Sequence, residues 1–325
     1  MKFKIIPIAG DASFRRFYRV IVGKKSKIVV IAQKKKYKNL ISYIAINKFL
    51  RQNNILAPKL LNYNYTQGII VIEDFGDLTF YKVLKKKLYK LNVYKKLVDL
   101  LIKIQKIKPK QKVKSINNNM HIIKKYSNKY LFEESNLFFD WYLPLFLSKK
   151  KALSIKKKAN KFLLTLYNKL YFPNSCFVHR DYHVQNLMHV GKKIGVIDTQ
   201  DALIGHPAYD LVSLVDDVRI KTSKNLKNEI YNYYLKKNLK NLKNYKNLSK
   251  NFLEDFKILS VQRSLKIIGI FSRLCVRDEK KQYLKLIPYT WQLLEMRMDV
   301  EIFAGLRKIF NENIPKNIKK KIIYK

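Results

Sequence analysis

The sequence is poor in cysteine, glycine, proline and acidic residues, and these shortages exclude several classes of protein. Two cysteines in 325 residues exclude a disulfide-stapled scaffold, and Cys176 and Cys275 have no zinc-ligand spacing. Nine glycines and eight prolines exclude collagen-like and low-complexity chains. Hydrophobic residues still make up 47% of the chain, which is enough to bury a core. We therefore expect a folded, reduced protein of about two domains or lobes.

The sequence also lacks an apolar run that could cross a bilayer. The longest run, residues 137–147, contains Asp140 and Pro144 and is shorter than the ~18 residues that a spanning helix needs. We expect no secretory signal in the N-terminal segment, because Gly10 and Asp11 interrupt its short apolar stretch. We expect a cytoplasmic protein without a membrane partner.

Acidic side chains are outnumbered by basic ones, 23 against 68, and the formal net charge is +45. Such an excess is typical of proteins that bind nucleic acids or membranes. Only 11 of the basic residues are arginine, however, and the abundant residues Lys, Asn, Ile, Tyr and Phe share A/T-rich codons. We therefore attribute the charge to codon composition and expect no specific nucleic-acid partner, with a polyanion-binding surface as the alternative. The sequence leaves the oligomeric state open.

Two parts of the chain differ in hydrophobic periodicity. Strands are predicted over residues 3–9, 14–22, 27–32 and 69–73, with a helix over 39–50. Beyond Gly76, helical periodicity prevails over residues 79–106, 120–147, 154–171, 226–239, 252–271 and 280–310. We expect residues 316–325 to form a frayed basic tail. The pattern predicts an α+β chain with a strand-rich lobe over residues 1–75 and a larger helical lobe over residues 76–325.

A strand–loop–strand stretch over residues 176–198 interrupts the helices and carries most of the chemically informative polar residues. The tripeptide His-Arg-Asp ends at Asp181, Asn186 follows five residues later, and Asp198 lies beyond a predicted β-turn. This order matches the phosphoryl-transfer motif H-R-D-x-x-x-x-N with a downstream metal-binding aspartate. It predicts that Asp181 accepts the proton of an attacking hydroxyl. Asn186 and Asp198 are the predicted Mg²⁺ ligands, since Mg²⁺ prefers carboxylate and carbonyl oxygens beside phosphate.

A simpler interpretation is that both aspartates are loop carboxylates satisfied by local amides. The full spacing makes this interpretation the weaker one. We expect His179 to be a structural hydrogen-bonding residue, because Asp181 already fills the acid–base role. Cys176 is expected to be a small buried apolar side chain.

The same stretch resembles the aminoglycoside phosphotransferase/choline kinase superfamily, through the pattern His179-x-Asp181-x-His183-x-x-Asn186. Other segments are similar to the bacterial N-acetylmuramate/N-acetylglucosamine anomeric kinases of cell-wall recycling. These segments are residues 10–20, 72–77, 137–142, 198–211 and 262–274, so the resemblance runs from residue 10 to about 295. It implies a protein-kinase-like two-lobed fold, ATP and Mg²⁺ as cofactors, and phosphorylation of the anomeric hydroxyl of an N-acetylated amino sugar.

The resemblance further implies how the nucleotide is bound. The turn that ends at Ser13 would cover the ATP phosphates with backbone N–H groups, although an ordinary hairpin turn explains this segment equally well. Arg16 would contact the phosphates. Glu73 and Phe75 would belong to the hinge whose backbone pairs with adenine.

For the acceptor side, the resemblance implies that Gln200 and Asp201 contact the sugar. The helix over residues 140–142 would also line the sugar pocket, although its Trp and Tyr are more typical of packing. Asp210 would be a buried structural carboxylate that braces the catalytic loop.

Two positions depart from the superfamily pattern. The strand lysine that pairs with the ATP phosphates should fall near Ala32, and no lysine stands there. No acidic residue lies between this strand and the next predicted one, so the usual Lys–Glu pair cannot form. Arg15, Arg16 and Lys34 are the candidates to replace that lysine. Thr199 stands where related kinases more often have phenylalanine.

Other acceptors and other functions stay open at this stage. Choline or an aminoglycoside would be a positively charged acceptor, and such a ligand needs an acidic or aromatic cage. Asp216 and Asp217 form an acidic pair, but they are expected to be solvated on a helix. An anionic N-acetylmuramate suits a basic chain better. A kinase-like protein that binds ATP or a polyanion without catalysis is the remaining alternative.

Overall fold

The computed structural model describes residues 3–8, 15–33, 38–87, 90–116 and 118–320. The chain divides into two compact units. Residues 1–125 and 176–204 form the first, called here the N-terminal unit, and residues 126–175 and 205–325 form the C-terminal unit. The lobes over residues 1–75 and 76–325 were predicted from hydrophobic periodicity, and they stay a prediction.

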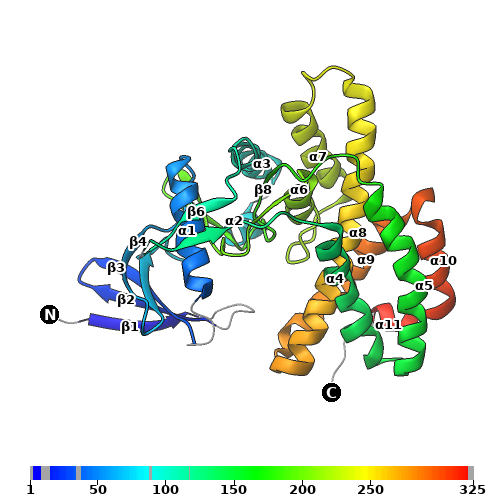
Figure 1. Ribbon diagram of the computed structural model, residues 1–325, viewed down its shortest axis with the longest axis horizontal. Helices are drawn as coiled ribbons and strands as arrows, with labels where there is room; N and C mark the ends of the chain where they lie inside the picture. Colours follow the sequence, from blue (N-terminus) through cyan, green and yellow to red (C-terminus); the bar gives the residue numbers. More distant parts are fainter. Residues whose placement is uncertain (1–2, 9–14, 34–37, 88–89, 117, 321–325) are drawn as a thin grey trace. The chain divides into compact units, whose positions relative to one another are not determined.

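A five-stranded antiparallel sheet opens the N-terminal unit (Figure 1). Its strands lie in the order β1-β2-β3-β5-β4. They are β1 (Phe3–Ile8), β2 (Arg16–Val22), β3 (Lys25–Ile31), β4 (Leu60–Asn64) and β5 (Ile69–Glu73). Four of the five were predicted. β4 was not, because its side chains are mostly exposed and carry little apolar alternation.

Helix α1 (Lys38–Gln52) packs on this sheet, as its predicted periodicity requires. Ile28 and Val30 alternate on β3, Leu40 and Ile44 are spaced four residues apart on α1, and all four are buried in one apolar cluster. Alternation in the strand and the four-residue spacing in the helix bring both sets of side chains to one interface. This interface fixes the N-terminal half of α1 on the sheet.

The rest of the N-terminal unit holds short elements that frame the predicted catalytic segment. They are α2 (Phe80–Lys86), α3 (Leu91–Gln105), β6 (Lys112–Lys114), β7 (Met120–Ile122), β8 (Cys176–Val178), β9 (Leu187–Val190), β10 (Lys193–Val196) and β11 (Leu203–Gly205). Strands β9 and β10 form a hairpin. Bridges from Leu56 to Gly195 and from Thr79 to Met188 attach this hairpin to the preceding part of the unit.

The C-terminal unit is helical. Its α-helices are α4 (Asn128–Leu137), α5 (Lys149–Asn168), α6 (Ala208–Val215), α7 (Lys224–Asn238), α8 (Tyr245–Asp278), α9 (Ile287–Met298), α10 (Ala304–Asn313) and α11 (Lys316–Lys320). A π-helical turn, η2 (Phe138–Tyr142), and the short 3₁₀ turns η3 (Leu143–Leu145), η4 (Lys281–Leu286) and η5 (Glu301–Phe303) connect them. The long α8 packs against α4, α6 and α9 and forms the axis of the unit.

Two expectations about helices were wrong. Residues 120–147 were predicted as helical, but the segment begins with β7, which pairs with β6. Residues 316–320 are the helix α11 rather than part of a frayed tail. There Ile318 is buried and the Lys319 ammonium lies 2.8 Å from the Glu295 carboxylate on α9. The sequence of this basic segment did not indicate these two contacts, because neither produces a periodic apolar pattern.

The predicted α+β class is confirmed: an antiparallel sheet in the N-terminal unit is followed by a mainly helical remainder. Cys176 and Cys275 are free thiols, and Cys176 is buried as expected. Among the described residues, no helix combines the length and the apolar character needed to span a membrane.

Candidate active site

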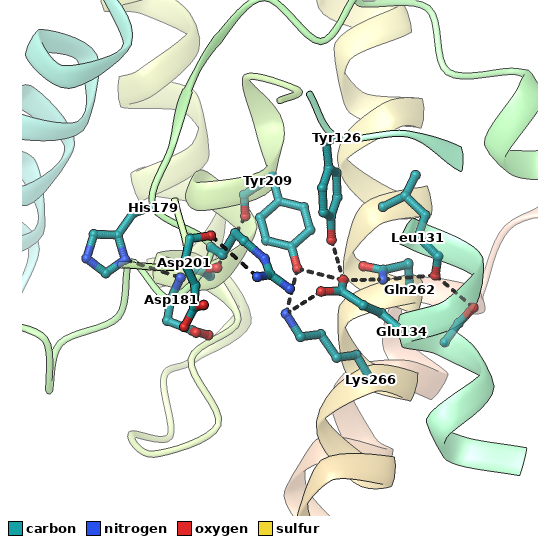
Figure 2. A network of polar contacts seen from close by, with 12 residues as sticks. Tyr126, Leu131, Glu134, His179, Asp181, Asp201, Tyr209, Gln262 and Lys266 are labelled. Carbon is teal, nitrogen blue, oxygen red and sulfur yellow. Dashed lines mark hydrogen bonds and ion pairs between the residues drawn. The ribbon is translucent and has the colours of Figure 1, made fainter. Parts of the chain in front are cut away.

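His179 ties together the two loops that carry the predicted catalytic residues. It is buried directly after β8, and its Nε2 lies 2.9 Å from the backbone carbonyl of Ile197. The backbone N–H of Asp181 donates to Nδ1 of the same ring at 3.3 Å (Figure 2). Because Nδ1 accepts, the neutral ring carries its proton on Nε2 and donates it to Ile197. The ring therefore links Asp181 to the residue before Asp198.

The loop between β8 and β9 orients Asn186 toward the same region. Nδ2 of Asn186 donates to the backbone carbonyl of Asp181 at 3.0 Å, and the N–H of His183 donates to that carbonyl at 2.9 Å. Since the amide nitrogen is held, Oδ1 is the end of Asn186 that can coordinate a cation. The N–H of Ile197 donates to the backbone carbonyl of Asn186 at 3.0 Å, which places Asp198 beside it.

The backbone is strained at both loops. Arg180, just before Asp181, has φ +75°, and Asp198 has φ +62°. Non-glycine residues rarely adopt this left-handed region, and each such residue costs about 1 kcal/mol or more. Strain of this kind persists where surrounding contacts fix the chain. Here it occurs at the residue before the predicted base and at a predicted metal ligand.

Arg15 and Gln200 hold the Asp198 carboxylate. Nη2 of Arg15 lies 2.8 Å from Oδ1 of Asp198, and Nη1 donates to Oε1 of Gln200 at 3.1 Å. Nε2 of Gln200 donates to Oδ1 of Asp198 at 3.1 Å and to Oδ2 of Asp201 at 3.0 Å. Both ends of the Gln200 amide are thus engaged with protein groups. The predicted sugar contacts of Gln200 and of the exposed Asp201 stay predictions.

The structure distinguishes among the predicted phosphate-binding residues. Two of the three candidate cations are among the described residues, and of these two Arg15 contacts a predicted metal ligand, Asp198. Arg16 is exposed at the start of β2. Ser13 and Lys34 lie outside the described residues, as does the turn over residues 10–13.

Helix α1 reaches the metal loop through neutral side chains. The hydroxyl of Thr199 donates to Oδ1 of Asn47 at 2.6 Å, and Nδ2 of Asn47 donates to the carbonyl of Pro58 at 3.2 Å. Both Thr199 and Asn47 are buried. The threonine at the position expected for phenylalanine therefore makes a polar link to α1, a contact that spacing could not predict.

A second feature missed by the sequence analysis is the ion-pair cluster that holds the hinge. Arg19 on β2 contacts both carboxylate oxygens of Asp74, at 2.6 and 3.0 Å, and Asp77 at 2.7 Å. Burial alone would raise the pKa of Asp74, but hydrogen bonds from Arg19 and from the Gly76 N–H lower it. Gly76 has φ +75°, which glycine adopts without strain, so the hinge can turn there.

The predicted hinge residues have their side chains occupied by protein contacts. Oε2 of Glu73 accepts from Arg51 at 3.1 Å and from the Lys59 N–H at 3.2 Å, and the Glu73 N–H donates to the Lys59 carbonyl. Phe75 lies over Gly195, where an added Cβ would come within 2.7 Å of its ring. The role of Glu73 and Phe75 in binding adenine stays a prediction.

The residues of the C-terminal unit that were predicted to line the sugar pocket differ in their contacts and exposure. Tyr142 is buried, donates to the carbonyl of Ile318 at 2.8 Å and accepts from the indole N–H of Trp291 at 2.9 Å. It is a core residue, as its aromatic type suggested. Asp140 instead pairs with the ammonium of Lys156 at 2.7 Å. Asp210 is fully buried in α6, and its bracing role stays a prediction.

The expectation that Asp216 and Asp217 are solvated was wrong, since both are buried. Burial alone would raise the pKa of Asp216, but Arg297 and Lys227 lower it to about 2. Arg297 contacts the carboxylate at 2.8 and 3.0 Å and Lys227 at 3.2 Å. Helical spacing gave no sign of these distant cations. Asp216 is already neutralised by them and cannot serve as a cage for a cationic ligand.

The donor set fits a magnesium–nucleotide complex better than a metal held by protein alone. Among the described residues, no three His, Cys, Asp or Glu side chains form a metal cluster. Mg²⁺ characteristically binds one or two carboxylates together with substrate phosphates and waters. Asp198, with its partly exposed carboxylate, and the Oδ1 of Asn186 offer such a set.

The chain is similar to known phosphotransferases and kinases over most of its length. A model of the phosphotransferase enzyme family matches residues 4–245. N-acetylmuramate/N-acetylglucosamine kinases from Pseudomonas aeruginosa and Neisseria meningitidis are each 29% identical to the chain. These alignments cover 90% and 88% of this chain, respectively, and 83% of each relative.

Solved structures show the same fold at lower sequence identity. An ADP-bound aminoglycoside phosphotransferase, APH(2″)-Ib, has a TM-score of 0.56 at 16% identity, covering 93% of this chain and 94% of its own. A choline/ethanolamine kinase family protein from Mesorhizobium loti has a TM-score of 0.61 at 11% identity, covering 95% and 92%. The kinase-like, two-lobed α+β fold is thus confirmed. The chain belongs to the phosphotransferase enzyme family and is a small-molecule kinase.

Proposed function

We propose that the protein transfers the γ-phosphate of Mg²⁺-ATP to the anomeric hydroxyl of N-acetylmuramate or N-acetylglucosamine, in cell-wall recycling. The observation that carries the transfer chemistry is the convergence of Asp181, Asn186 and Asp198 through His179 and Ile197. The acceptor follows from the four relatives, all named N-acetylmuramate/N-acetylglucosamine kinase, which match 84–90% of this chain.

In this proposal Asp181 is the general base. Its carboxylate accepts the proton of the acceptor hydroxyl as the oxygen attacks the γ-phosphorus. One O–P bond forms, the bond from the γ-phosphorus to the bridging oxygen breaks, and ADP leaves with that electron pair. An anomeric hydroxyl is more acidic than an ordinary alcohol, so it suits a base as weak as a carboxylate.

Asn186 and Asp198 are the residues that would hold Mg²⁺. When bound, the ion neutralises the negative charge that spreads over the transferring phosphoryl group. The contacts from Arg15 and Gln200 keep the Asp198 carboxylate in one orientation for this role. Fixing such a ligand beforehand avoids the cost of ordering it during the reaction.

For the nucleotide, we assign adenine recognition to the backbone of the hinge that follows β5. The carbonyl of Glu73 and the N–H of Phe75 fit this role, because the Glu73 N–H already donates to Lys59. Residues 1–75 would then supply nucleotide contacts, and residues 76–325 the catalytic loop and the acceptor pocket. ATP as the phosphate donor is consistent with a cytoplasmic location.

The acceptor class is supported in part by the acidic pair that was considered as a cage for choline or an aminoglycoside. Asp216 of that pair is neutralised by Arg297 and Lys227. A neutral or anionic sugar needs no such cage. Asp201 is exposed beside Gln200, so its carboxylate can accept hydrogen bonds from sugar hydroxyls.

The test is ADP release from Mg²⁺-ATP with separate acceptors. N-acetylmuramate, N-acetylglucosamine, choline and an aminoglycoside are compared with the methyl glycoside of N-acetylglucosamine, whose anomeric oxygen is blocked. We expect turnover with the two free sugars, none with the methyl glycoside, and a sugar 1-phosphate identified by NMR. Turnover with the methyl glycoside would move the reaction to another hydroxyl, and turnover with choline alone would overturn the acceptor class.

A further inference from the structure

Arg15 stands next to the position where the superfamily carries its phosphate-binding lysine. Strands β2 and β3 pair with Arg16 opposite Ile31, and continuing that register by one residue puts Arg15 opposite Ala32. Ala32 is buried and its N–H donates to the Gly68 carbonyl at 2.9 Å. Arg15, the residue just before β2, thus lies near the position at which β3 lacks a cation.

The surroundings of Arg15 hold its guanidinium in one orientation. Its two terminal nitrogens contact Asp198 at 2.8 Å and Gln200 at 3.1 Å. The guanidinium carbon also lies 5.4 Å from the ring centre of Phe17 and 5.5 Å from that of Tyr43. Burial raises the pKa of Tyr43 to about 12, so its ring stays a neutral aromatic surface. A planar cation between aromatic rings and two acceptors is strongly pre-organised.

The ion pair of Arg15 with Asp198 is open to solvent on the carboxylate side alone. The Arg15 side chain is 4% exposed, whereas that of Asp198 is 44% exposed. The two charges cancel in the absence of a metal. A divalent cation on the exposed carboxylate would leave an excess of positive charge, and the buried guanidinium contributes to it with little screening by water. Such a site attracts an anion with several charges.

Helix α1 does not supply the acidic member of the usual Lys–Glu pair. It carries no carboxylate, and it meets this region through the Tyr43 ring and through the bond from Thr199 to Asn47. Residues 198, 199 and 200 are therefore each held by a side chain from the first 52 residues.

We propose that Arg15 replaces the strand lysine of this kinase: it positions Asp198 and supplies positive charge to the phosphate chain of the bound nucleotide. The inference rests on the proposed function for its nucleotide but not for its acceptor. It therefore can be tested by nucleotide binding without any sugar.

The experiment is a calorimetric titration of the full chain with AMP, ADP and ATP in excess Mg²⁺, for wild type, Arg15→Gln and Arg15→Lys. Glutamine retains N–H donors toward Asp198 but no charge, and lysine retains the charge. Lys25→Met, at an exposed position of β3, is the control for the loss of one positive charge. Thermal unfolding is recorded for each variant. Because Asp198 is partly exposed, its loss of a partner leaves a solvated carboxylate and the variants should fold.

We expect Arg15→Gln to lose about tenfold or more in ATP affinity and less than about threefold in AMP affinity. Arg15→Lys should retain most of the preference for ATP, and Lys25→Met all of it. An unchanged ATP-to-AMP affinity ratio in Arg15→Gln would overturn the proposal, whether both affinities stay the same or both fall equally. If Arg15→Gln fails to fold, loss of the ratio in a folded Arg15→Lys chain would overturn it, and its retention would support it.

The acceptor assay on wild type separates this inference from the proposed function. If no sugar supports ADP release while the ATP-to-AMP ratio depends on Arg15, the acceptor assignment fails and Arg15 keeps its role. If sugars are phosphorylated and the ATP-to-AMP affinity ratio does not depend on Arg15, the acceptor assignment stands and the role of Arg15 fails.

Discussion

Both units contain carboxylates paired with cations at similar distances, but solvent reaches them differently. In the N-terminal unit the Arg15–Asp198 contact is 2.8 Å, with the carboxylate 44% exposed. In the C-terminal unit the Asp216 carboxylate lies 2.8 Å from Arg297 and 3.2 Å from Lys227, and its side chain is 3% exposed. A solvent-exposed carboxylate, called open here, has oxygen lone pairs available to coordinate a ligand. A buried carboxylate, called closed here, has its oxygens occupied by contacts within the protein. Of these two pairs, the one at the candidate site is the one whose carboxylate is exposed.

A second closed cluster in the C-terminal unit supports the same distinction (Figure 2). Glu134 on α4 accepts from Tyr126 and from Gln262 and pairs with Lys266 at 3.0 Å, and Lys266 also donates to Tyr209. The cluster joins α4, α6 and α8 in the interior. Residues 262–274 resembled the amino-sugar kinases in sequence, and this cluster gives Gln262 and Lys266 a role in packing.

The largest effect is expected from Asp181→Asn, which removes the proposed base. We expect kcat to fall by two to four orders of magnitude, because an amide cannot accept the proton. Asp181 is only partly buried, so the midpoint of thermal unfolding should stay within a few degrees of wild type. Steady-state ADP release and calorimetry check both values. Activity within tenfold of wild type would remove Asp181 from the mechanism.

A large effect of a different kind is expected from Asp216→Asn, which breaks a closed pair. It leaves the buried Lys227 and the partly buried Arg297 without their counter-charge, and we expect a loss of about 3–5 kcal/mol in the free energy of unfolding. Urea unfolding at pH 7 measures it. Glu229→Gln, an exposed acid on the same helix as Lys227, is the control and should change stability by less than about 0.5 kcal/mol.

The pH dependence of stability sharpens this prediction. The pKa of Asp216 is lowered from 3.8 to about 2, so its contribution is complete above about pH 4 and is lost as the pH falls toward 2. Asp216→Asn lacks that contribution at every pH. The difference in unfolding free energy between wild type and variant should therefore shrink on acidification, and a constant difference down to pH 2 would contradict the pairing.

A smaller loss is expected from Gly269→Ala on α8. A Cβ at this position would meet the backbone of Leu137 and Phe138, which cannot move aside as a side chain can. We expect a loss of about 1–3 kcal/mol from overpacking. Gly305→Ala on α10 is the matched control, since its Cβ meets the partly exposed Phe162 ring, which can rotate away. Equal effects of the two substitutions in urea unfolding would contradict close packing of α8.

In the N-terminal unit, Gly195→Ala should act on the nucleotide and not on the sugar. The added methyl would press on the Phe75 ring and displace the hinge backbone. We expect the KM for ATP to rise about three- to tenfold while the KM for the sugar changes less than twofold. The double variant Gly195→Ala/Phe75→Leu should recover part of the loss, and a failure to recover would show that the effect is not transmitted through Phe75.

The smallest effect is expected from Asp140→Asn. This carboxylate is paired with Lys156 at the surface, and such pairs contribute about 0–1 kcal/mol. Because the lysine already engages it, we expect the KM for the sugar to stay within about twofold. An increase of tenfold or more, at unchanged stability, would instead place Asp140 in the acceptor pocket.

Local patterns in the sequence predicted those parts of the fold that depend on local chemistry. Alternating apolar residues gave β1, β2, β3 and β5, and the H-R-D-x-x-x-x-N spacing gave the loop of Asp181 and Asn186. The strands β6 and β7 are three residues long, which is too short for a periodic signal. The first turns of α8 are rich in Lys and Asn, so only its apolar centre was predicted.

Contacts between distant segments could not be predicted from one sequence. Arg15 and Asp198 are 183 positions apart, and Thr199 and Asn47 are 152 apart. The sequence offered three equivalent cations for the phosphate site, and the contact of Arg15 with Asp198 became evident only from the structure. The ion pair between Arg19 and Asp74 at the predicted hinge could not be predicted either, because neither segment has a local sequence pattern that indicates it.

The most direct test of the role assigned to the exposed carboxylate of the Arg15–Asp198 pair is a measurement of metal binding. Mn²⁺ replaces Mg²⁺, and its EPR signal is titrated with the full chain and the non-hydrolysable nucleotide AMP-PNP. Wild type, Asp198→Asn and the control Asp140→Asn are compared. If Asp198 is the open carboxylate that takes the metal, Asp198→Asn will weaken Mn²⁺–nucleotide binding by about tenfold or more, and Asp140→Asn will not change it. Binding by a folded Asp198→Asn chain that equals wild type would contradict the assignment of the candidate site.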